Sequence, residues 1–220
     1  MRLRALVYLS AATLVVLVGG FFLLRGRISF GEARSAANTS NHSNRVTIQR
    51  VNTDFIAGTT LPSQKLAPDF TLTDQSGKQF DLKEMRGHPV LITFMDATCK
   101  QECPVTAQYL NWTKQFLGAE DANKIDWIAV SVNPNNTPAQ AKAFIAKYKP
   151  GVPLLFALGT HQQLSSVWQA YHITVIPKSG DVQHTIVYYL LDKNGHEREI
   201  VDQGFDPKQM AHDLRVLLSE

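Results

Sequence analysis

The sequence has few cysteines: Cys99 and Cys103 are the only two in 220 residues. Two cysteines are too few to hold together a disulfide-rich secreted scaffold. A structural zinc site normally has four protein ligands, and the chain has no third cysteine to help supply them. Any cysteine chemistry in this protein must therefore use this one pair.

The sequence also lacks long basic blocks and internal repeats. Its formal net charge is only +3, so the charge pattern does not favour nucleic acid binding. The apolar fraction of 44% is normal for a globular protein. A chain of this length can hold one domain of ordinary size with flanking segments.

Charged residues are missing from Ala5 to Leu24, and this apolar run is about long enough to span a membrane. Arg25-Gly26-Arg27 follows it directly, so there is no A-x-A-like cleavage site, and no nearby cysteine is available for lipid attachment. The alternative is a cleaved signal peptide. We expect residues 1–25 to form an uncleaved transmembrane helix, whose orientation the flanking arginines leave open.

The stretch that follows has little periodicity. Residues 25–45 are rich in Ser, Ala, Asn and Gly, a composition typical of a flexible tether. Residues 46–61 are ambiguous, because part of this stretch could pack on the domain. We therefore expect a linker over residues 26–65 and a folded domain over residues 66–220.

Strand-like and helix-like patterns alternate in the expected domain. Strand patterns occur at residues 67–73, 78–82, 89–95, 124–132, 153–157, 184–191 and 197–201. Helical patterns occur at residues 105–117, 137–148, 160–171 and 206–218, and the last three begin at Thr or Asp N-caps. The first two strands are expected to form a β-hairpin, and residues 175–181 a loop. This order predicts an α/β sandwich.

The two cysteines lie where a buried strand meets a helix. The apolar run Pro89–Met95 precedes Thr98-Cys99-Lys100-Gln101-Glu102-Cys103-Pro104. Pro104 is best accommodated in the first turn of a helix, so the pair is expected at a helix N-terminus. That end of a helix is electropositive and favours the thiolate form. The arrangement is of the thioredoxin type, with a spacing of C-x-x-x-C instead of C-x-x-C.

Three roles for the pair are open. A structural disulfide between residues four apart would close a very short loop and stabilise the fold little. Redox exchange in the manner of thioredoxin would use the two thiols without a metal. A metal site would combine two thiolates with an imidazole, a soft ligand set that suits Cu(I) and is possible for Cu(II).

The candidate imidazole belongs to His184. It is expected at the junction between a loop and the strand that neighbours the cysteine-bearing strand, where thioredoxins place a cis-proline facing the dithiol. The other six histidines are expected to be ordinary surface or core residues: His42, His88, His161, His172, His196 and His212.

From Leu66 to Leu218 the sequence resembles the Sco/SenC family, copper proteins that help to assemble cytochrome c oxidase. The most specific part of the resemblance is C-x-x-x-C-P at residues 99–104 together with His184 before Y-L-L-D-x-N-G at residues 189–195. Further matches are APDFTL at 67–72, GHPVLITF at 87–94 and VSVNP at 130–134. The chain departs from the family at three places. Lys100-Gln101 stands where the family often has Pro-Asp, and Asn133 stands where it often has Asp. Asp96-Ala97 stands where an aromatic residue is common.

The resemblance implies a thioredoxin-like sandwich with an N-terminal β-hairpin, preceded by one transmembrane helix. It implies that Cys99, Cys103 and His184 bind copper, as Cu(I), Cu(II) or both. The implied protein is a monomeric metallochaperone on the extracytoplasmic side of the cell membrane. It would deliver copper to the CuA site of oxidase subunit II, or reduce the cysteines of that site. Other copper chaperones or thiol reductases are further expected partners.

The alternative is a thiol-disulfide oxidoreductase in which Cys99 and Cys103 form the catalytic redox pair without an obligatory metal. Two related families fit less well. The peroxiredoxin motif P-x-x-x-T-x-x-C would need Pro and Thr where Ile92 and Asp96 stand. Anchored dithiol reductases carry W-C-x-x-C and a cis-proline, and Pro177 lies too early in the chain to replace that proline.

Overall fold

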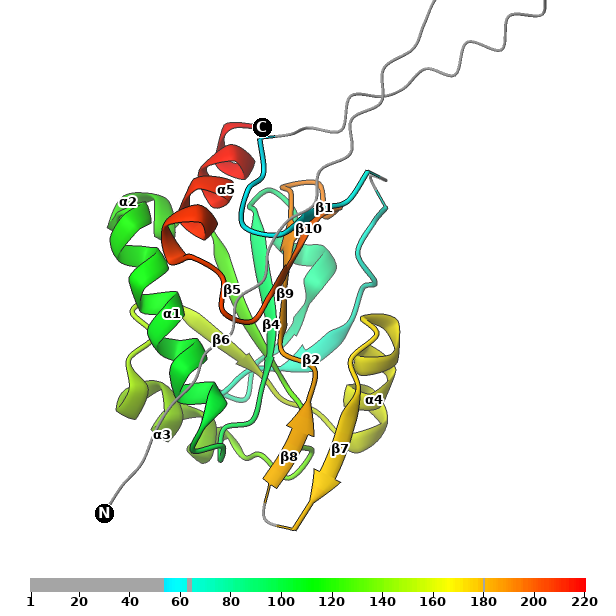
Figure 1. The fold of residues 1–220 in the computed structure, drawn as a ribbon. Coiled ribbons are helices and arrows are strands. Elements are labelled where there is room, and N and C mark those ends of the chain that lie inside the picture. The colour runs from blue at the N-terminus through cyan, green and yellow to red at the C-terminus, as the bar shows by residue number, and fades with distance from the viewer. Residues whose placement is uncertain (1–53, 63–64, 180) are drawn as a thin grey trace, which may run out of the picture. The chain divides into compact units, whose positions relative to one another are not determined.

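The computed structural model describes residues 54–62, 65–179 and 181–220 (Figure 1). The expected membrane anchor and most of the expected linker lie outside the described residues. Within these three ranges, no helix combines the length and the hydropathy needed to cross a membrane.

Most strands belong to one six-stranded sheet (Figure 1). In sheet order they are β1 (Thr59–Thr60), β10 (Glu197–Asp202), β9 (Val187–Leu191), β4 (Val90–Met95), β5 (Asp126–Ser131) and β6 (Leu154–Ala157). The central strand β4 runs parallel to β5 and antiparallel to β9. All six residues of β4 are buried, as its continuous apolar sequence predicts.

Helices cover both faces of this sheet (Figure 1). They are α1 (Glu102–Leu117), α2 (Ala119–Ala122), α3 (Pro138–Tyr148), α4 (His161–Ala170), α5 (Pro207–Ser219) and the 3-10 helix η1 (Leu82–Met85). Side chains of β4 and β5 alternate between two hydrophobic cores, because successive strand residues point to opposite faces. One core contains residues of α1, α2, α3 and α5, and the other contains residues of α4 and η1.

The helix starts predicted at Thr137 and Thr160 are confirmed. The Thr137 hydroxyl accepts a hydrogen bond from Gln140 N, and the Gln140 side chain accepts one from Thr137 N at 2.8 Å. Thr160 and Gln163 form the same reciprocal capping box at the start of α4. These bonds satisfy amides that the first turn of a helix otherwise leaves without partners.

Two short hairpins stand outside the main sheet. The predicted hairpin is confirmed as β2 (Thr71–Thr73) paired with β3 (Gln79–Asp81). The second hairpin, β7 (Val175–Lys178) with β8 (Asp181–His184), corrects the prediction of a loop over 175–181. It also splits the strand predicted over 184–191. Thr185 N still donates to Thr174 O of the hairpin side, and β9 begins only at Val187. Ile176, Pro177 and Lys178 are exposed, so no buried periodicity marked β7 in the sequence.

The folded unit begins before the expected boundary at Leu66. Phe55 is buried in the core that contains α5, and β1 pairs with β10. We call residues 55–60 the entry segment. Its one large buried side chain is Phe55, which gave too weak a pattern to predict this packing.

Buried carboxylates hold the backbone of the entry segment. The Asp213 carboxylate accepts hydrogen bonds from Ile56 N at 3.0 Å and from Ala57 N at 2.6 Å. Glu199 Oε1 accepts one from Gly58 N at 2.6 Å. The segment is therefore attached mainly through its amides, which hydrophobic patterns do not report.

The main sheet ends in short backbone contacts at both of its edges. On one side β1, only two residues long, pairs with β10. On the other side Thr73 pairs with Leu158, just beyond β6. The Gln75 side chain donates to Leu154 O at 3.1 Å and accepts from Phe156 N at 2.8 Å, so it occupies backbone groups of β6.

Candidate metal centre

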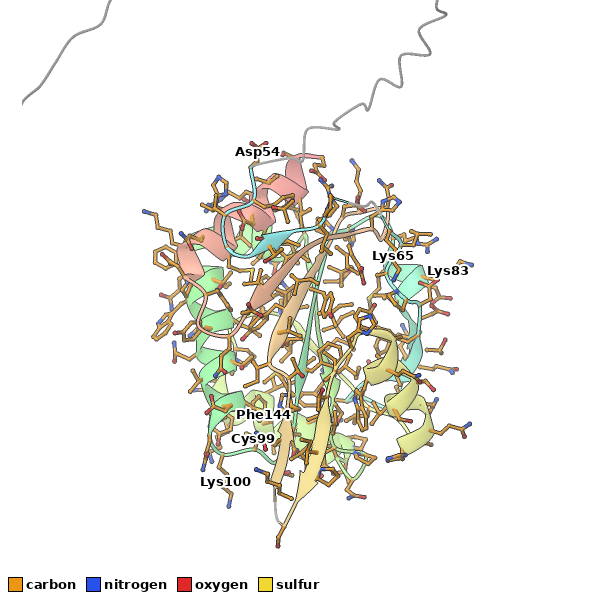
Figure 2. All side chains as sticks on the ribbon, turned by 45° about the vertical axis from the view of Figure 1, so that its right-hand side comes forward. Asp54, Lys65, Lys83, Cys99, Lys100 and Phe144 are labelled. Carbon is orange, nitrogen blue, oxygen red and sulfur yellow. The ribbon has the colours of Figure 1, made fainter. Side chains whose placement is uncertain are left out.

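The fold places the two cysteines at the carboxyl end of β4. Cys99 lies in the cysteine loop (residues 96–101), and Cys103 lies in the first turn of α1. Cys99 is half-buried, Cys103 is 2% exposed, and both are free thiols. Figure 2 shows Cys99 at one end of the folded unit and Asp54, where the described chain begins, near the other. The predicted position of the pair at a helix N-terminus is therefore confirmed.

The two sulfur atoms have different environments. Cys99 Sγ accepts a hydrogen bond from Cys103 N at 3.4 Å, and Cys103 Sγ accepts one from Asp96 N at 3.4 Å. A hydrogen bond from the Cys103 thiol, together with backbone amides of the first helical turn, lowers the pKa of Cys99 to about 6 although burial opposes this. The same thiol-to-sulfur bond and burial raise the pKa of Cys103. At neutral pH the pair is therefore a thiolate at Cys99 and a thiol at Cys103.

A buried carboxylate organises the cysteine loop. Asp96 is 2% exposed, and its Oδ1 accepts hydrogen bonds at 2.8 Å from Thr98 N, Thr98 Oγ1 and Asn136 Nδ2. Its Oδ2 accepts one from Asn133 Nδ2 at 3.1 Å. Asn136 Oδ1 in turn accepts from Ala97 N at 2.9 Å. Asp96 thus ties the loop that carries Cys99 to the loop after β5, a role that the sequence analysis did not assign to it.

His184 is the last residue of β8, and two residues separate it from β9. Because β9 pairs with β4, and Thr93 Oγ1 donates to Val187 O at 3.2 Å, β9 begins beside the end of β4 from which the cysteine loop leaves. The imidazole itself is occupied elsewhere, with Nδ1 2.8 Å from Thr185 O. Among the described residues, no three His, Cys, Asp or Glu side chains are grouped closely enough to hold a metal ion. The structure brings the two cysteines together, and the ligand role of His184 stays a prediction.

The two cysteines alone are a reasonable copper ligand set. Cu(I) is satisfied by two soft thiolate ligands, and a bound cation favours loss of the proton from a coordinating thiol. Three other histidines pair instead with carboxylates: His88 with Asp126, His196 with Asp192, and His212 with Asp213. His42 lies outside the described residues.

Comparison with known proteins shows the family of the chain. The SCO1/SenC family model matches residues 58–219. The chain belongs to the SCO1/SenC family. This confirms the family predicted from the C-x-x-x-C-P motif and its distant histidine.

Individual relatives of this SCO1/SenC protein include mitochondrial SCO2 of Saccharomyces cerevisiae, 26% identical over 161 residues that cover 70% of the chain and 53% of the relative. The chain thus spans about half the length of that yeast protein. Thiol-disulfide oxidoreductase ResA of Geobacillus kaustophilus is 26% identical over 147 residues, 67% of the chain and 73% of ResA. The solved structure of Bradyrhizobium japonicum ScoI with copper bound is 30% identical, with a TM-score of 0.61, and the match covers 70% of this chain and 99% of ScoI. The predicted thioredoxin-like α/β fold is confirmed for the described domain.

Proposed function

We propose that this protein is a copper-binding metallochaperone of cytochrome c oxidase assembly. It would deliver copper to the CuA site of oxidase subunit II, or reduce the cysteines of that site. The observation that carries the proposal is the free Cys99–Cys103 pair, in which Cys99 has a lowered pKa and is half-buried at the end of the domain. The likeness to ScoI, solved with copper bound, supports copper as the cargo.

Anaerobic titration of the reduced full-length chain with Cu(I), in detergent and against a competing chelator, tests this function. We expect one copper per chain, and an affinity lower by about 100-fold or more in Cys99→Ala and Cys103→Ala, because each loses one of two soft ligands. Oxidation to a Cys99–Cys103 disulfide removes both ligands and should abolish binding. If the air-oxidised chain binds Cu(I) as tightly as the reduced chain, the ligands are wrongly assigned.

A thiol-disulfide oxidoreductase is the second candidate function. The unequal thiols favour it, because a thiolate at Cys99 can attack a disulfide and the Cys103 thiol can then release the mixed disulfide. The relationship to ResA, named as such an enzyme, supports it as well. Rapid reduction of a test disulfide by a chain that binds no copper would favour this candidate over the metallochaperone.

We further propose that His184 completes the copper site after its ring leaves Thr185 O. Imidazole matters more for Cu(II) than for Cu(I). His184→Ala should therefore keep most Cu(I) affinity, weaken Cu(II) binding by about tenfold or more, and lose the thiolate-to-copper absorption band. His172→Ala and His161→Ala are the matched controls and should change neither. If one of these controls loses the band while His184→Ala keeps it, the third ligand is misassigned.

We also propose that residues 1–25 anchor the protein in the cell membrane, with the domain on the extracytoplasmic side. The uncharged run Ala5–Leu24 and the family support this arrangement. Protease added to spheroplasts should then digest the domain, and protection would contradict the orientation. A mature protein whose sequence starts after Leu24 would contradict the anchor.

A further inference from the structure

A cavity of about 460 Å³ opens beside the cysteine loop. Its walls come from the cysteine loop, the loop after β5, α4 and the β7–β8 hairpin. This volume is in the range of sites that bind small ligands or single side chains. Neither Cys99 nor Cys103 lines it, so a group held in the cavity leaves both sulfur atoms available.

The cavity contains a buried carboxyl group. Asp96 lines it and is 2% exposed. All four hydrogen bonds to its carboxylate come from neutral donors, on Thr98, Asn133 and Asn136. Within the described part of the chain, no Lys, Arg or His forms an ion pair with it. Burial reduces the screening of charges by solvent, so a cationic donor that reaches this carboxyl group interacts with it more strongly than it would at the surface.

One oxygen of Asp96 has capacity for a further donor. Oδ1 already accepts three hydrogen bonds, whereas from the described residues Oδ2 accepts one, from Asn133 Nδ2. A carboxylate offers about two acceptor positions on each oxygen. A cationic donor in the cavity would therefore bind at Oδ2 without displacing the bonds that hold the cysteine loop.

The rest of the lining suits an aliphatic stem. Val132, Val182 and Trp168 contribute apolar wall, and the Trp168 indole is fixed because its Nε1 donates to Ser131 O at 2.9 Å. Long cationic side chains pack their methylene groups on such surfaces, and an aromatic face also attracts the cation itself. Lys178 lines the cavity too and opposes a cation, but it is exposed, so solvent and salt screen its charge more than that of Asp96.

We propose that this cavity binds a guanidinium or ammonium group on a short aliphatic stem, with the cation at Asp96 Oδ2 and the stem along Trp168 and Val182. The group can be an Arg or Lys side chain of the polypeptide that exchanges copper or a disulfide with Cys99, or a free alkyl cation. Only the first source rests on the proposed function.

Calorimetric titration of the reduced, copper-free full-length chain with N-butylguanidinium tests the site without using thiol or metal chemistry. We expect saturable binding about tenfold tighter than that of the neutral N-butylurea. Asp96→Asn should remove this preference. Because Asn at 96 also disturbs the loop contacts, Lys178→Glu is the second variant: it lies on the surface and should tighten binding several-fold.

Lys147→Glu, an exposed charge reversal on α3 outside the cavity lining, is the matched control and should change nothing. Three results would each overturn the proposed site. They are equal binding of the guanidinium and the urea, absence of saturable binding, and an unchanged affinity in Lys178→Glu.

A second measurement separates the two sources. Two disulfide peptides that differ only in Arg or citrulline beside the cysteine are reacted with the reduced chain. Several-fold faster exchange of the Arg peptide, lost in Asp96→Asn, assigns the site to a partner side chain. Equal rates with intact butylguanidinium binding assign it to a free cation. Absence of any exchange with intact butylguanidinium binding counts against the thiol function and leaves the cavity site standing.

Discussion

At the scale of single residues, the site depends on two sulfur atoms that differ in charge. Cys99 is a thiolate because Cys103 donates to it, and Cys103 keeps its proton for the same reason. The half-buried Cys99 is thus ready to attack or to bind a metal, and the fully buried Cys103 follows once Cys99 has reacted. The thiol-to-sulfur bond should be measurable through the reactivity of Cys99.

The alkylation rate of Cys99 with iodoacetamide should rise with pH around an apparent pKa of about 6, because only the thiolate reacts. In Cys103→Ala the midpoint should move up towards the ordinary thiol range, since the largest stabilising bond is gone. Cys103→Ser is the matched control, because its hydroxyl still donates and should keep part of the shift. Mass spectrometry identifies the modified residue. A midpoint that stays near pH 6 in Cys103→Ala would mean that backbone amides alone set it.

The sequence identified the cysteines but not the residue that positions their loop. Cys99 and Cys103 are recognisable because their spacing and the following proline form a local motif. Asp96 appeared only as a departure from the family pattern. Its partners Asn133 and Asn136 are 37 and 40 residues away in the chain, and no local spacing reports a contact of that separation.

At the scale of elements, the entry segment is held by two fully buried carboxyl groups. Glu199 and Asp213 are both 0% exposed. Burial and the neighbouring charge of Asp213 raise the pKa of Glu199 to about 8. In the described part of the protein, Glu199 Oε2 has no hydrogen-bond partner, and His212 Nδ1 lies 2.9 Å from Asp213 Oδ1. A proton on Glu199 relieves the repulsion between the two groups.

The stability of the domain should therefore fall as pH rises. The pKa of Glu199 is higher in the folded state than its ordinary value near 4.5. The contribution of protonated Glu199 to the free energy of unfolding is therefore complete below pH 4.5 and is lost as pH rises through about 8. We expect the Tm of the full-length chain to fall by roughly 5 °C or more between pH 6 and pH 9.

Glu199→Gln stays neutral at both pH values and should flatten this slope. Glu84→Gln, an exposed residue of η1, is the matched control and should keep the wild-type slope. Thermal unfolding followed by circular dichroism gives the comparison. Parallel slopes for Glu199→Gln and wild type would show that another group carries the pH dependence.

Elements with a buried face were predictable, and exposed ones were not. The strands β4 and β5 and the helices α3 and α4 were recognisable from apolar runs or capping boxes. The strands β1 and β7 were missed. The strand β1 has only two residues and follows backbone amides that bind buried carboxyl groups, and β7 exposes three of its four residues. Hydrophobic periodicity reports burial, so it could not indicate either strand.

At the scale of the whole molecule, the sheet order explains why distant parts of the chain meet. The strand β4 is parallel to β5 and antiparallel to β9. Because β9 runs in the opposite direction, it begins at the end of the sheet where β4 finishes. This brings the two residues between His184 and β9 to the end of the domain that carries the cysteine loop. Only the thioredoxin-type arrangement and the family resemblance indicated this relation beforehand, because the strand order cannot be derived from the periodicity of separate segments.

The covered sheet edges also bear on how the protein behaves at high concentration. An outer strand with a full row of unpaired amides and carbonyls invites β-aggregation between chains. Here β1 blocks the outer side of β10, Gln75 blocks that of β6, and Thr73 pairs with Leu158 just beyond β6. A chain cut to begin at Leu66 loses β1 and exposes β10, so light scattering on heating should begin at a lower temperature than for a chain beginning at Asp54. Equal onset temperatures would mean that the two residues of β1 give no protection against aggregation. A shortened chain for expression could then begin at either residue.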